Sequence, residues 1–445
     1  MIDAISFFNK YFLGVCVPVL LMLLGIFYCV RLKFFHFLHP FKTVKALFIR
    51  DSVDGVSPTR AVTLALAGTL GVGNMVGVAS AIALGGYGAV FWMWISATLA
   101  MVLKYAEIVL GMAHRRYDKD GKPYGAAMYY IKDCFGNGQI GVILSSVFAL
   151  FCIFNSISMG SMIQVNAAAN AMQGAFGVRP IFVGLIFAAI AFFAMKKGSN
   201  GILRMTEKLV PIMSIGFIIL SLCVIVIRFD LAIEAVKLIF EDAFDFKSSV
   251  GGVFGFLFSN SIRYGTMRGI LSNEAGCGTA PAAHAVSSCK VPAKQGVWGI
   301  FEVFVDTLLL CTLTALVLII GGGKSVLSGD NYMMMTVDAY SSVLGNIAGG
   351  FVSLSVVLFG IATVLCWGFY GIESVKYLFK GKNICNAFIL IYSVSVVLGS
   401  VLSSKIIWEV ADLSIGVMTF INLFILLVMN REVKRETDFY FKNTK

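Results

Sequence analysis

The fold is decided by one interrupted apolar segment, which contains Gly68-Thr69-Leu70-Gly71-Val72-Gly73-Asn74-Met75-Val76-Gly77. Each glycine costs a helix about 1 kcal/mol relative to alanine and accepts backbone angles that other residues avoid. In hydrocarbon, a broken helix leaves polar backbone groups unpaired, so a break persists only where protein buries it or where it lines a watery cavity. Close helix–helix packing through Gly73 and Gly77 is the alternative explanation.

A second apolar segment, residues 250–275, runs into a similar interruption at Ser272-Asn273-Glu274-Ala275-Gly276-Cys277-Gly278. The two breaks fall in the second and the seventh apolar segments of the chain, so we expect these segments to cross a membrane in opposite directions. Corresponding glycine-interrupted segments in two halves of a chain are the best sequence indication of a transporter binding site. The halves show no obvious residue-level similarity, so this inverted repeat is inferred from topology.

The composition indicates a membrane protein. Of the 445 residues, 58% are hydrophobic and 13% are charged, whereas a soluble domain averages about 25% charged residues. The formal charge of +11 does not indicate nucleic-acid binding, because the basic residues lie in short loops between apolar runs. The ten cysteines are scattered without a CxxC pair and are interpreted as small buried hydrophobes.

Eleven segments approach or exceed the ~20 residues that a bilayer requires. They are residues 11–31, 59–84, 86–112, 139–172, 180–195, 209–228, 250–275, 297–322, 347–375, 384–403 and 408–430. We expect an all-α polytopic membrane protein with a single membrane domain over residues 1–445. It consists of an extra N-terminal helix and loop (11–58), two five-helix repeats (59–228 and 250–430) and a tail (431–445). The acidic stretch 229–247 predicts an amphipathic helix that lies outside the membrane.

The distribution of Lys and Arg predicts the orientation. With the N-terminus outside, the cytoplasmic loops and the C-terminal tail hold 27 of the 35 basic residues, and the outside segments hold seven. Cytoplasmic loops carry an excess of Lys and Arg. The N-terminus is therefore expected outside and the C-terminus in the cytoplasm.

The motifs resemble those of the alanine or glycine:cation symporter family. The resemblance rests on residues 68–77 and 272–278, Pro281, Lys104-Tyr105-Ala106-Glu107, Asp118-Lys119-Asp120-Gly121, Asp306-Thr307, Cys311-Thr312, Trp367 and Tyr370-Gly371, and it covers nearly the whole chain. Ala126-Ala127 departs from the family, which more often has glycine and proline there. Leu271 departs from an expected phenylalanine, which puts the shape of the pocket in doubt.

The resemblance implies a fold, a function and a place. The fold is the inverted repeat of the sodium-coupled leucine transporter type, with one extra N-terminal helix. The function is Na⁺-coupled symport of alanine or glycine into a prokaryotic cell across its inner membrane. Na⁺ is then the coupling ion, and neither a cofactor nor an enzymatic activity is expected.

The resemblance also implies a substrate site at the two breaks. The α-carboxylate is expected against backbone N–H groups near Gly71 to Asn74, and the ammonium against carbonyls near Leu271 and Ser272. The candidate substrate-binding residues are Gly71, Val72, Gly73, Asn74, Gln164, Leu271, Ser272, Asn273 and Trp367. Asn74 and Asn273 are either ligands or clamps on unwound backbone, because a buried amide without partners is costly.

Two of these candidates have ordinary alternatives. The resemblance places Gln164 in contact with the substrate, whereas the residue alone is also typical of an interhelical hydrogen bond. It likewise places Trp367 over the substrate, where its bulk would exclude side chains larger than methyl. A tryptophan at a membrane interface would be unremarkable in its own right.

The expected sodium site needs uncharged oxygens. Thr363 lies one turn before Trp367 and, with the carbonyls of Leu70 or Gly71 and of Gly73, is the main candidate, and Thr69 is a weaker one. The alternative for Thr363 is a hydrogen bond to its own helix at i−4.

Three intramembrane carboxylates are candidates for coupling or gating: Glu274, Asp306 and Glu107. Lys104 precedes Glu107 by three residues, so a helical i,i+3 pair is the simpler interpretation of those two. Glu274 and Asp306 could each link to a coupling ion or hold the broken helix. Asp306 could instead form a gate pair with Arg263 or Arg268.

Other functions are weighed against symport. The four histidines lie in or near predicted cytoplasmic loops without metal-ligand spacing, which argues against a metal enzyme. An intramembrane enzyme would need a nucleophile and a base at matched depth, and no such pair is evident. The same fold could carry serine, or could use H⁺ in place of Na⁺, although no carboxylate adjoins Thr363 in the sequence. The sequence does not predict an oligomeric state.

Overall fold

The computed structural model describes residues 2–38, 55–136, 138–244, 260–323, 331–402 and 404–443. In these ranges the chain is helical apart from a hairpin of β1 (Arg116–Tyr117) and β2 (Pro123–Tyr124). The α-helices are α1 (Ile2–Phe8), α2 (Gly14–Arg31), α3 (Phe35–Leu38), α5 (Pro58–Thr69), α6 (Val78–Gly85), α7 (Ala89–Ala113), α8 (Ala127–Cys134), α9 (Gln139–Ile157), α10 (Gln164–Phe176), α11 (Pro180–Lys196), α12 (Ser199–Ile227), α13 (Phe229–Ala243), α15 (Asn260–Asn273), α16 (Ala280–His284), α17 (Pro292–Val303), α18 (Thr312–Gly322), α19 (Tyr332–Leu344), α20 (Asn346–Leu378), α21 (Lys382–Val401), α22 (Ser404–Val428) and α23 (Asn430–Asn443).

Four π-helical turns connect successive α-helices. They are Asn9–Leu13 between α1 and α2, Gly73–Gly77 before α6, Ser158–Ile163 between α9 and α10, and Phe304–Cys311 between α17 and α18. π-turns inside helices frequently mark functional sites. Three of these four adjoin the candidate site described below.

The described residues contain eight helices that are long and apolar enough to cross a membrane, and up to nine when the bent pair Pro58–Thr69 and Gly73–Gly85 counts as one span. The expectation of eleven spans is therefore met in part. Helix α11 is apolar but has only 17 residues. Residues 250–259 of the predicted seventh span lie outside the described ranges, which leaves the 14 residues of α15.

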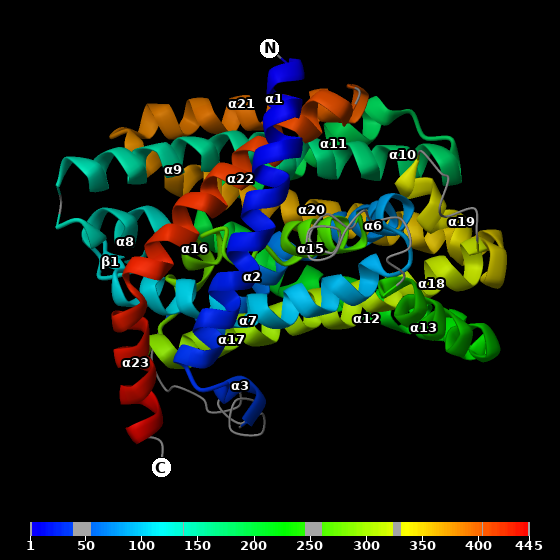
Figure 1. Cartoon of the computed structure of the whole chain (residues 1–445). Coiled ribbons are helices and arrows are strands. Elements are labelled where there is room, and N and C mark those ends of the chain that lie inside the picture. Colours follow the sequence, from blue (N-terminus) through cyan, green and yellow to red (C-terminus); the bar gives the residue numbers. More distant parts are fainter. Residues whose placement is uncertain are drawn as a thin grey trace.

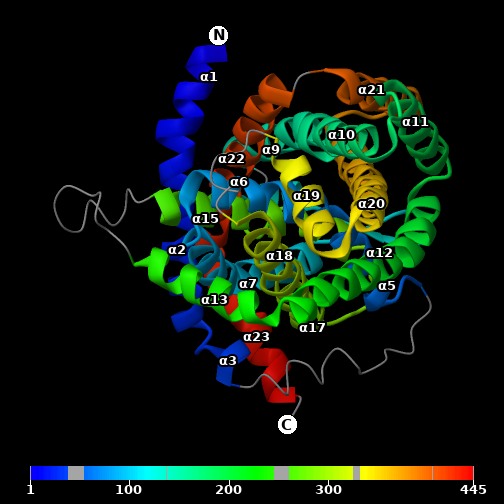
Figure 2. The same ribbon diagram turned by 90° about the vertical axis from the view of Figure 1, so that its right-hand side faces the viewer.

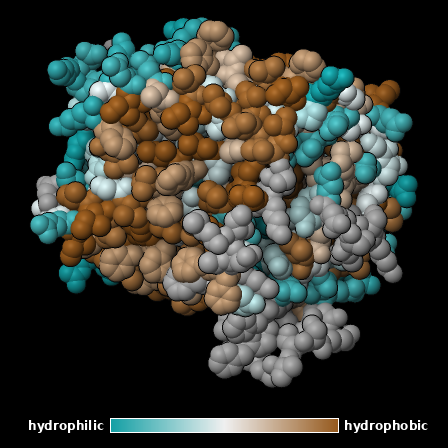
Figure 3. Space-filling model, turned by 90° about the horizontal axis from the view of Figure 1, so that it is seen from above, coloured by the Kyte–Doolittle hydropathy of each residue, from teal (hydrophilic) through white to brown (hydrophobic). Residues whose placement is uncertain are grey.

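The bundle is organised around α20, a helix of 33 residues that contacts α5, α9, α10 and α12 (Figure 1). Many helices are seen nearly end-on in Figure 2, where α10, α11, α20 and α21 stand on the opposite side of the molecule from α2. Large apolar side chains are exposed on the outer faces, among them Ile143, Ile212 and Leu390. Figure 3 shows such side chains spread broadly over one face. A soluble monomer rarely exposes so large an apolar patch, whereas lipid accommodates it.

Of the amphipathic helix predicted at 229–247, the structure shows α13, Phe229–Ala243, and residues 245–247 lie outside the described ranges. It is tied to the start of α7, because Gly88 N donates to Asp242 Oδ2 at 2.7 Å and Trp92 Nε1 donates to Ala243 O at 3.2 Å. Helix α19 was not among the predicted segments. It packs between α18 and α20.

The C-terminal helix α23 is attached at the end of α7 through His114. His114 Nδ1 lies 2.8 Å from Asp133 Oδ2, and its Nε2 lies 3.4 Å from Glu432 Oε2. Burial opposes the charged ring, but hydrogen bonds to Glu432 and Asp133 outweigh it and raise the pKa of His114. The hydrogen bond from His114 in turn lowers the pKa of Glu432. The protonated histidine therefore stabilises this end of the molecule.

Candidate functional site

The first predicted break is present. Helix α5 begins with a capped turn, because Ser57 Oγ accepts from Arg60 N at 3.3 Å and Pro58 occupies the first position. It ends at Thr69, and the chain resumes as a helix at Gly73 after a bend of 51°. Gly71 sits at the bend because a Cβ there would lie 2.7 Å from Thr363 Oγ1 and 2.9 Å from Gln164 Oε1.

The second predicted break is also present. Helix α15 ends at Asn273, and α16 begins at Ala280. Between them the backbone of Glu274 has a φ of +53°, and Gly276 and Gly278 have φ values of +79° and +77°. A non-glycine residue in the left-handed region is uncommon and costs of order 1–3 kcal/mol, so such residues persist where their surroundings hold them.

Asn74 connects the two breaks. Its Oδ1 accepts a hydrogen bond from Gly71 N at 3.0 Å, and its Nδ2 donates to Ser272 Oγ at 3.0 Å and to Asp306 Oδ1 at 2.7 Å. Ser272 Oγ donates to the other Asp306 oxygen at 2.8 Å. Of the two predicted roles for Asn74, these contacts correspond to the clamp on unwound backbone.

Asn273 holds the second break in the same way. Its Oδ1 accepts from Ala275 N at 3.0 Å, and its Nδ2 donates to Thr307 Oγ1 at 3.0 Å. Its carbonyl oxygen accepts from Lys104 Nζ at 2.9 Å. Lys104 and Glu302, both fully buried, form an ion pair with Nζ 3.1 Å from Oε1. The Lys104 ammonium thus satisfies a carbonyl that the end of α15 leaves free.

The expected helical pair of Lys104 with Glu107 is wrong, because Lys104 pairs with Glu302 across the helix interface. Glu107 instead accepts from Gly278 N at 2.9 Å and from Asn422 Nδ2 at 3.0 Å. Helical spacing made the i,i+3 contact possible, but the unpaired N–H of the second break competes for the same carboxylate.

The expected gate pair of Asp306 with an arginine is absent from the described residues. Asp306 instead accepts hydrogen bonds from Asn74, Ser272 and Thr307.

His284, which we expected in or near a cytoplasmic loop, is buried, with Nε2 3.3 Å from Glu302 Oε2. Both residues thus belong to polar contacts inside the bundle.

A small cavity, here called the central cavity, lies between the breaks. It is lined by Gly68, Thr69, Gly71, Gly73, Gly77, Met159, Ile163, Gln164, Arg268, Leu271, Glu274 and Trp408. Its volume is about 20 Å³, little more than the ~10–15 Å³ that one water requires. The predicted residues that line it are Thr69, Gly71, Gly73, Gln164, Leu271 and Glu274. In this conformation the central cavity therefore has no room for an amino acid.

Gln164 both lines the central cavity and touches the first break. Its Oε1 accepts from Val72 N at 3.0 Å, and its Nε2 donates to Met159 O at 3.1 Å. With Gly71 N donating to Asn74, two of the backbone N–H groups expected to meet a substrate carboxylate donate to side chains in this conformation.

Trp367 is fully buried and is not an interfacial residue. Its Nε1 donates to Glu274 Oε1 at 3.1 Å, and Thr279 Oγ1 donates to Glu274 Oε2 at 2.8 Å. Gly160 makes room for the ring, because a Cβ there would lie 2.3 Å from Trp367 Cβ. Trp367 is not among the lining residues of the central cavity, so it meets that cavity through Glu274.

Thr363 makes the hydrogen bond to its own helix that the sequence offered as the alternative to sodium binding, and it also lies near the first break. Its Oγ1 lies 3.1 Å from Phe359 O on its own helix and 3.4 Å from Leu70 O at the first break. Thr69 Oγ1 is buried without a hydrogen-bond partner in the described part of the chain. The sodium site at these residues stays a prediction.

Arg268 and Trp408 line the central cavity but were not predicted to do so. Arg268 precedes Ser272 by one helical turn, so the rule that intramembrane charges are functional could have found it. Trp408 carried no such signal, because its position depends on how α22 packs.

The whole chain, residues 1–445, matches the model of the sodium:alanine symporter family. Over 98% of the chain and 96% of the relative, it is 34% identical to "Sodium/alanine symporter AgcS" of Methanococcus maripaludis. It is 31% identical to "Probable sodium/glutamine symporter GlnT" of Bacillus subtilis, over 93% and 85% of the two chains.

The fold is similar to that of MhsT, crystallised with L-phenylalanine, with a TM-score of 0.62, 13% identity and coverage of 87% of this chain and 93% of that one. That structure has the fold of the sodium-coupled leucine transporter. These findings confirm the resemblance noted in the sequence. The molecule is a multi-pass membrane transporter of the Na⁺-coupled symporter class and not an enzyme, and the chain belongs to the sodium:alanine symporter family.

Proposed function

We propose that this protein takes up alanine or glycine together with Na⁺. One observation carries the proposal: the two helix breaks meet on one buried cavity of about 20 Å³. Broken helices present N–H and C=O groups to a zwitterion and an ion. Since the cavity now holds little more than one water, it would widen when an amino acid enters, and the choice of alanine or glycine rests on the family to which the chain belongs.

The sodium ion is assigned to the contact between the first break and α20. Thr363 Oγ1 lies 3.4 Å from Leu70 O, and Thr69 Oγ1 is nearby in sequence with no other partner in the described residues. Na⁺ would draw on these oxygens and on the carbonyls of Gly71 and Gly73. Because the same break also lines the central cavity, binding of the ion and of the amino acid each favours one arrangement of the break, so each raises affinity for the other.

The chain is divided into two five-helix repeats, 59–228 and 250–430, with 11–58 and 431–445 outside them, and transport proceeds by alternating access as one group of helices rocks against a scaffold. We assign the N-terminus to the outside and the C-terminus to the cytoplasm of a prokaryotic cell, from the distribution of Lys and Arg. The moving part consists of the predicted segments two, three, seven and eight.

The alternative is another small neutral amino acid, such as serine, or coupling to H⁺. The relative named as a glutamine symporter is nearly as similar to this chain as the one named as an alanine symporter. Family membership alone therefore leaves the solute open. We favour alanine or glycine because the family model is that of sodium:alanine symporters and the relative at 34% identity is named for alanine.

The test is uptake of radiolabelled alanine into proteoliposomes under an imposed inward Na⁺ gradient, competed with unlabelled amino acids from glycine to leucine. We expect uptake that needs Na⁺, is electrogenic, and is competed by glycine, alanine and serine. Protein-free liposomes and an inward K⁺ gradient are the controls. Uptake that persists when a pH gradient replaces the Na⁺ gradient would reassign the coupling ion, and competition by glutamine or leucine would reassign the solute.

A further inference from the structure

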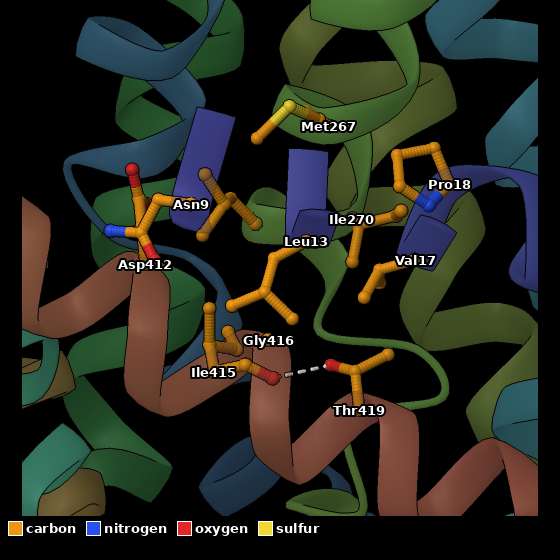
Figure 4. A pocket seen from close by; sticks show the side chains of 11 residues that line it. Asn9, Leu13, Val17, Pro18, Met267, Ile270, Asp412, Ile415, Gly416 and Thr419 are labelled. Atoms are coloured by element: carbon orange, nitrogen blue, oxygen red, sulfur yellow. Dashed lines mark hydrogen bonds between the residues drawn. The ribbon is translucent and has the colours of Figure 1, made fainter. Parts of the chain in front are cut away.

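The N-terminal segment and α22 meet closely at one point. Gly416 allows this contact, because a Cβ there would lie 2.5 Å from Leu13 Cδ1. Figure 4 shows Leu13 and Gly416 at the crossing, beside a pocket of about 40 Å³. Helices that cross at an angle diverge away from their point of closest approach, so α2 and α22 leave space between them further along both chains.

That space is an apolar groove of about 420 Å³, here called the α2–α22 groove. Each helix contributes four Leu or Phe side chains to it. Leu24 and Leu423 are buried and form its floor, whereas Leu23 and Phe424 are 60% and 49% exposed along its walls. Its volume lies within the ~300–1,000 Å³ that is typical of ligand sites. The groove can therefore hold a ligand that is apolar along its length.

The floor of the α2–α22 groove lies against the second break. A Cβ on Gly276 would lie 3.0 Å from Leu423 Cδ2. The preceding residue, Asn422, donates from Nδ2 to Gly276 O at 2.9 Å. A ligand in the groove therefore contacts the side chain that packs on the second break.

A positive charge stands at the end of the α2–α22 groove. Arg31, the last residue of α2, follows Phe27 by four residues and so lies on the helix face that lines the groove. Helical side chains lean toward the N-terminus of their helix, which here is toward the groove. The charge of Arg31 acts on the hydroxyl of Tyr28, which donates to Leu426 O on α22 at 2.7 Å. The guanidinium thus lies near the contact between the two helices.

Arg31 forms no ion pair with any of the described residues, and its Nε is buried there without a hydrogen-bond acceptor. A positive charge is favourable at the C-terminal end of any helix, so the position of Arg31 alone does not indicate a ligand. A buried guanidinium N–H without an acceptor does, because arginine stays charged and such groups are rarely left unpaired. The planar donors of guanidinium match the oxygens of a phosphate.

We propose that an anionic phospholipid binds in the α2–α22 groove, with one acyl chain between the two helices and its phosphate on Arg31. In the proposed orientation this end of α2 faces the cytoplasm, and the cytoplasmic leaflet carries anionic lipids that basic groups between helices bind. The bound lipid stabilises the contact between α2 and α22. The inference does not depend on which solute or ion the protein transports.

The experiment compares phosphatidylglycerol with phosphatidylcholine of the same acyl chains. Delipidated protein in detergent is titrated with each lipid, the dissociation constants are measured by native mass spectrometry, and the melting temperature is recorded. We expect wild type to bind phosphatidylglycerol at least about 10-fold more tightly, as for a charge-assisted hydrogen bond, and to melt at a higher temperature when it is bound. Arg31→Gln should bring the two lipids within about 3-fold of each other.

Lys196→Gln is the control for charge, since it removes one positive charge from the end of α11 on the opposite side of the molecule (Figure 2). It should keep the wild-type preference. Arg31→Lys keeps the charge at the groove, should retain most of the preference, and guards against misfolding of the glutamine variant.

The groove itself is tested by filling it. Leu23→Trp places a larger side chain in the wall and should weaken both lipids by at least about 5-fold, because each methylene that an acyl chain buries contributes about 0.8 kcal/mol. Ile26→Trp is the matched control, since Ile26 is exposed on α2 but does not line the groove. It should leave both dissociation constants unchanged.

Three outcomes would overturn the inference. The first is equal binding of the two lipids by wild type, or a preference that survives Arg31→Gln. The second is a fall in melting temperature of Arg31→Gln with unchanged lipid affinities, which would give Arg31 a partner within the protein. The third is a change from dimer to monomer in Leu23→Trp with unchanged lipid affinities, which would identify the groove as an interface between two copies of the chain.

Discussion

Replacing Lys104 with methionine should destabilise the whole bundle. Lys104 is 0% exposed, and its ammonium donates to Asn273 O at 2.9 Å and lies 3.1 Å from Glu302 Oε1. Lys104 also interacts electrostatically with two further buried carboxylates, Glu107 and Glu274. Methionine fills a similar volume, so the packing of α7 against α17 is preserved and only the charge is lost.

The magnitude follows from burial. Removing one partner of a buried ion pair costs about 3–5 kcal/mol, because the other charge is left uncompensated. The loss of the hydrogen bond to Asn273 O adds about 1–3 kcal/mol for an unsatisfied buried acceptor. We therefore expect Lys104→Met to lower the free energy of unfolding by about 4–8 kcal/mol. Lys104→Met with Glu302→Gln should recover more than half of that loss, since the stranded charge of Glu302 is then removed.

The assay is SDS-induced unfolding in mixed micelles, followed by tryptophan fluorescence. Lys376→Met is the control, because Lys376 pairs with Glu373 at 2.7 Å but its side chain is 54% exposed, and such a surface pair contributes about 0–1 kcal/mol. If Lys104→Met falls within about 1 kcal/mol of Lys376→Met, or if the double variant is no more stable than the single one, the stranded-charge argument is refuted.

The remaining predictions concern the ion, the size of the solute and pH. Thr363→Val should raise the Na⁺ concentration needed for half-maximal alanine binding by about 10-fold or more, as expected for the loss of an oxygen ligand. If that Na⁺ concentration is unchanged in a normally folded variant, Thr363 is not part of the sodium site. Trp367→Ala should weaken alanine binding and favour valine and leucine relative to alanine by about 1–3 kcal/mol. The assay is competition by unlabelled amino acids from glycine to leucine. If the rank order of these competitors is unchanged, Trp367 has a structural role alone. The raised pKa of His114 means that its stabilising charge is fully present below the pKa of the unfolded chain, ~6.5, and is lost as pH rises through the folded value. The stability difference between wild type and His114→Gln should therefore shrink from pH 6 to pH 9, and a difference that grows with pH would contradict the contacts to Asp133 and Glu432.

The positions of both helix breaks could be predicted from the sequence, because glycine and intramembrane polarity are local signals. The runs 68–77 and 272–278 interrupt helices in the structure at Thr69 and Asn273. The amphipathic helix α13 could be predicted for the same reason, from its acidic residues alone. Helix α19 could not, since its 13 residues are too few to register as a span.

The partners of the buried charges could not be predicted from the sequence. A helix offers only i+3 and i+4 neighbours to local reasoning, which is why Lys104 was assigned to Glu107. In the structure Lys104 reaches Asn273 across 169 positions and Asn422 reaches Glu107 across 315. The rule that buried charges are paired predicted that partners exist, but only the packing of α7 against α15 and α17 determines which ones.

The buried polar contacts divide the helices at the site into two groups, one tied together by many contacts and one joined to it by few. Asn74, Ser272 and Asp306 tie the first break, α15 and the turn after α17 together, and Lys104 ties α7 to α15 and α17. These elements are the four predicted segments that would move as one body, and their shared contacts are buried and short. The contacts between this body and the rest of the bundle at the site are Thr363 to Leu70, Gln164 to Val72, and Trp367 to Glu274. Leu70 and Val72 belong to the first break, and Glu274 belongs to the second. Movement between the two bodies must exchange these three contacts. A solute that binds at the breaks would compete for the same groups. In the proposed mechanism, binding at this site and the relative position of the bodies are therefore linked, which is the physical requirement for alternating access.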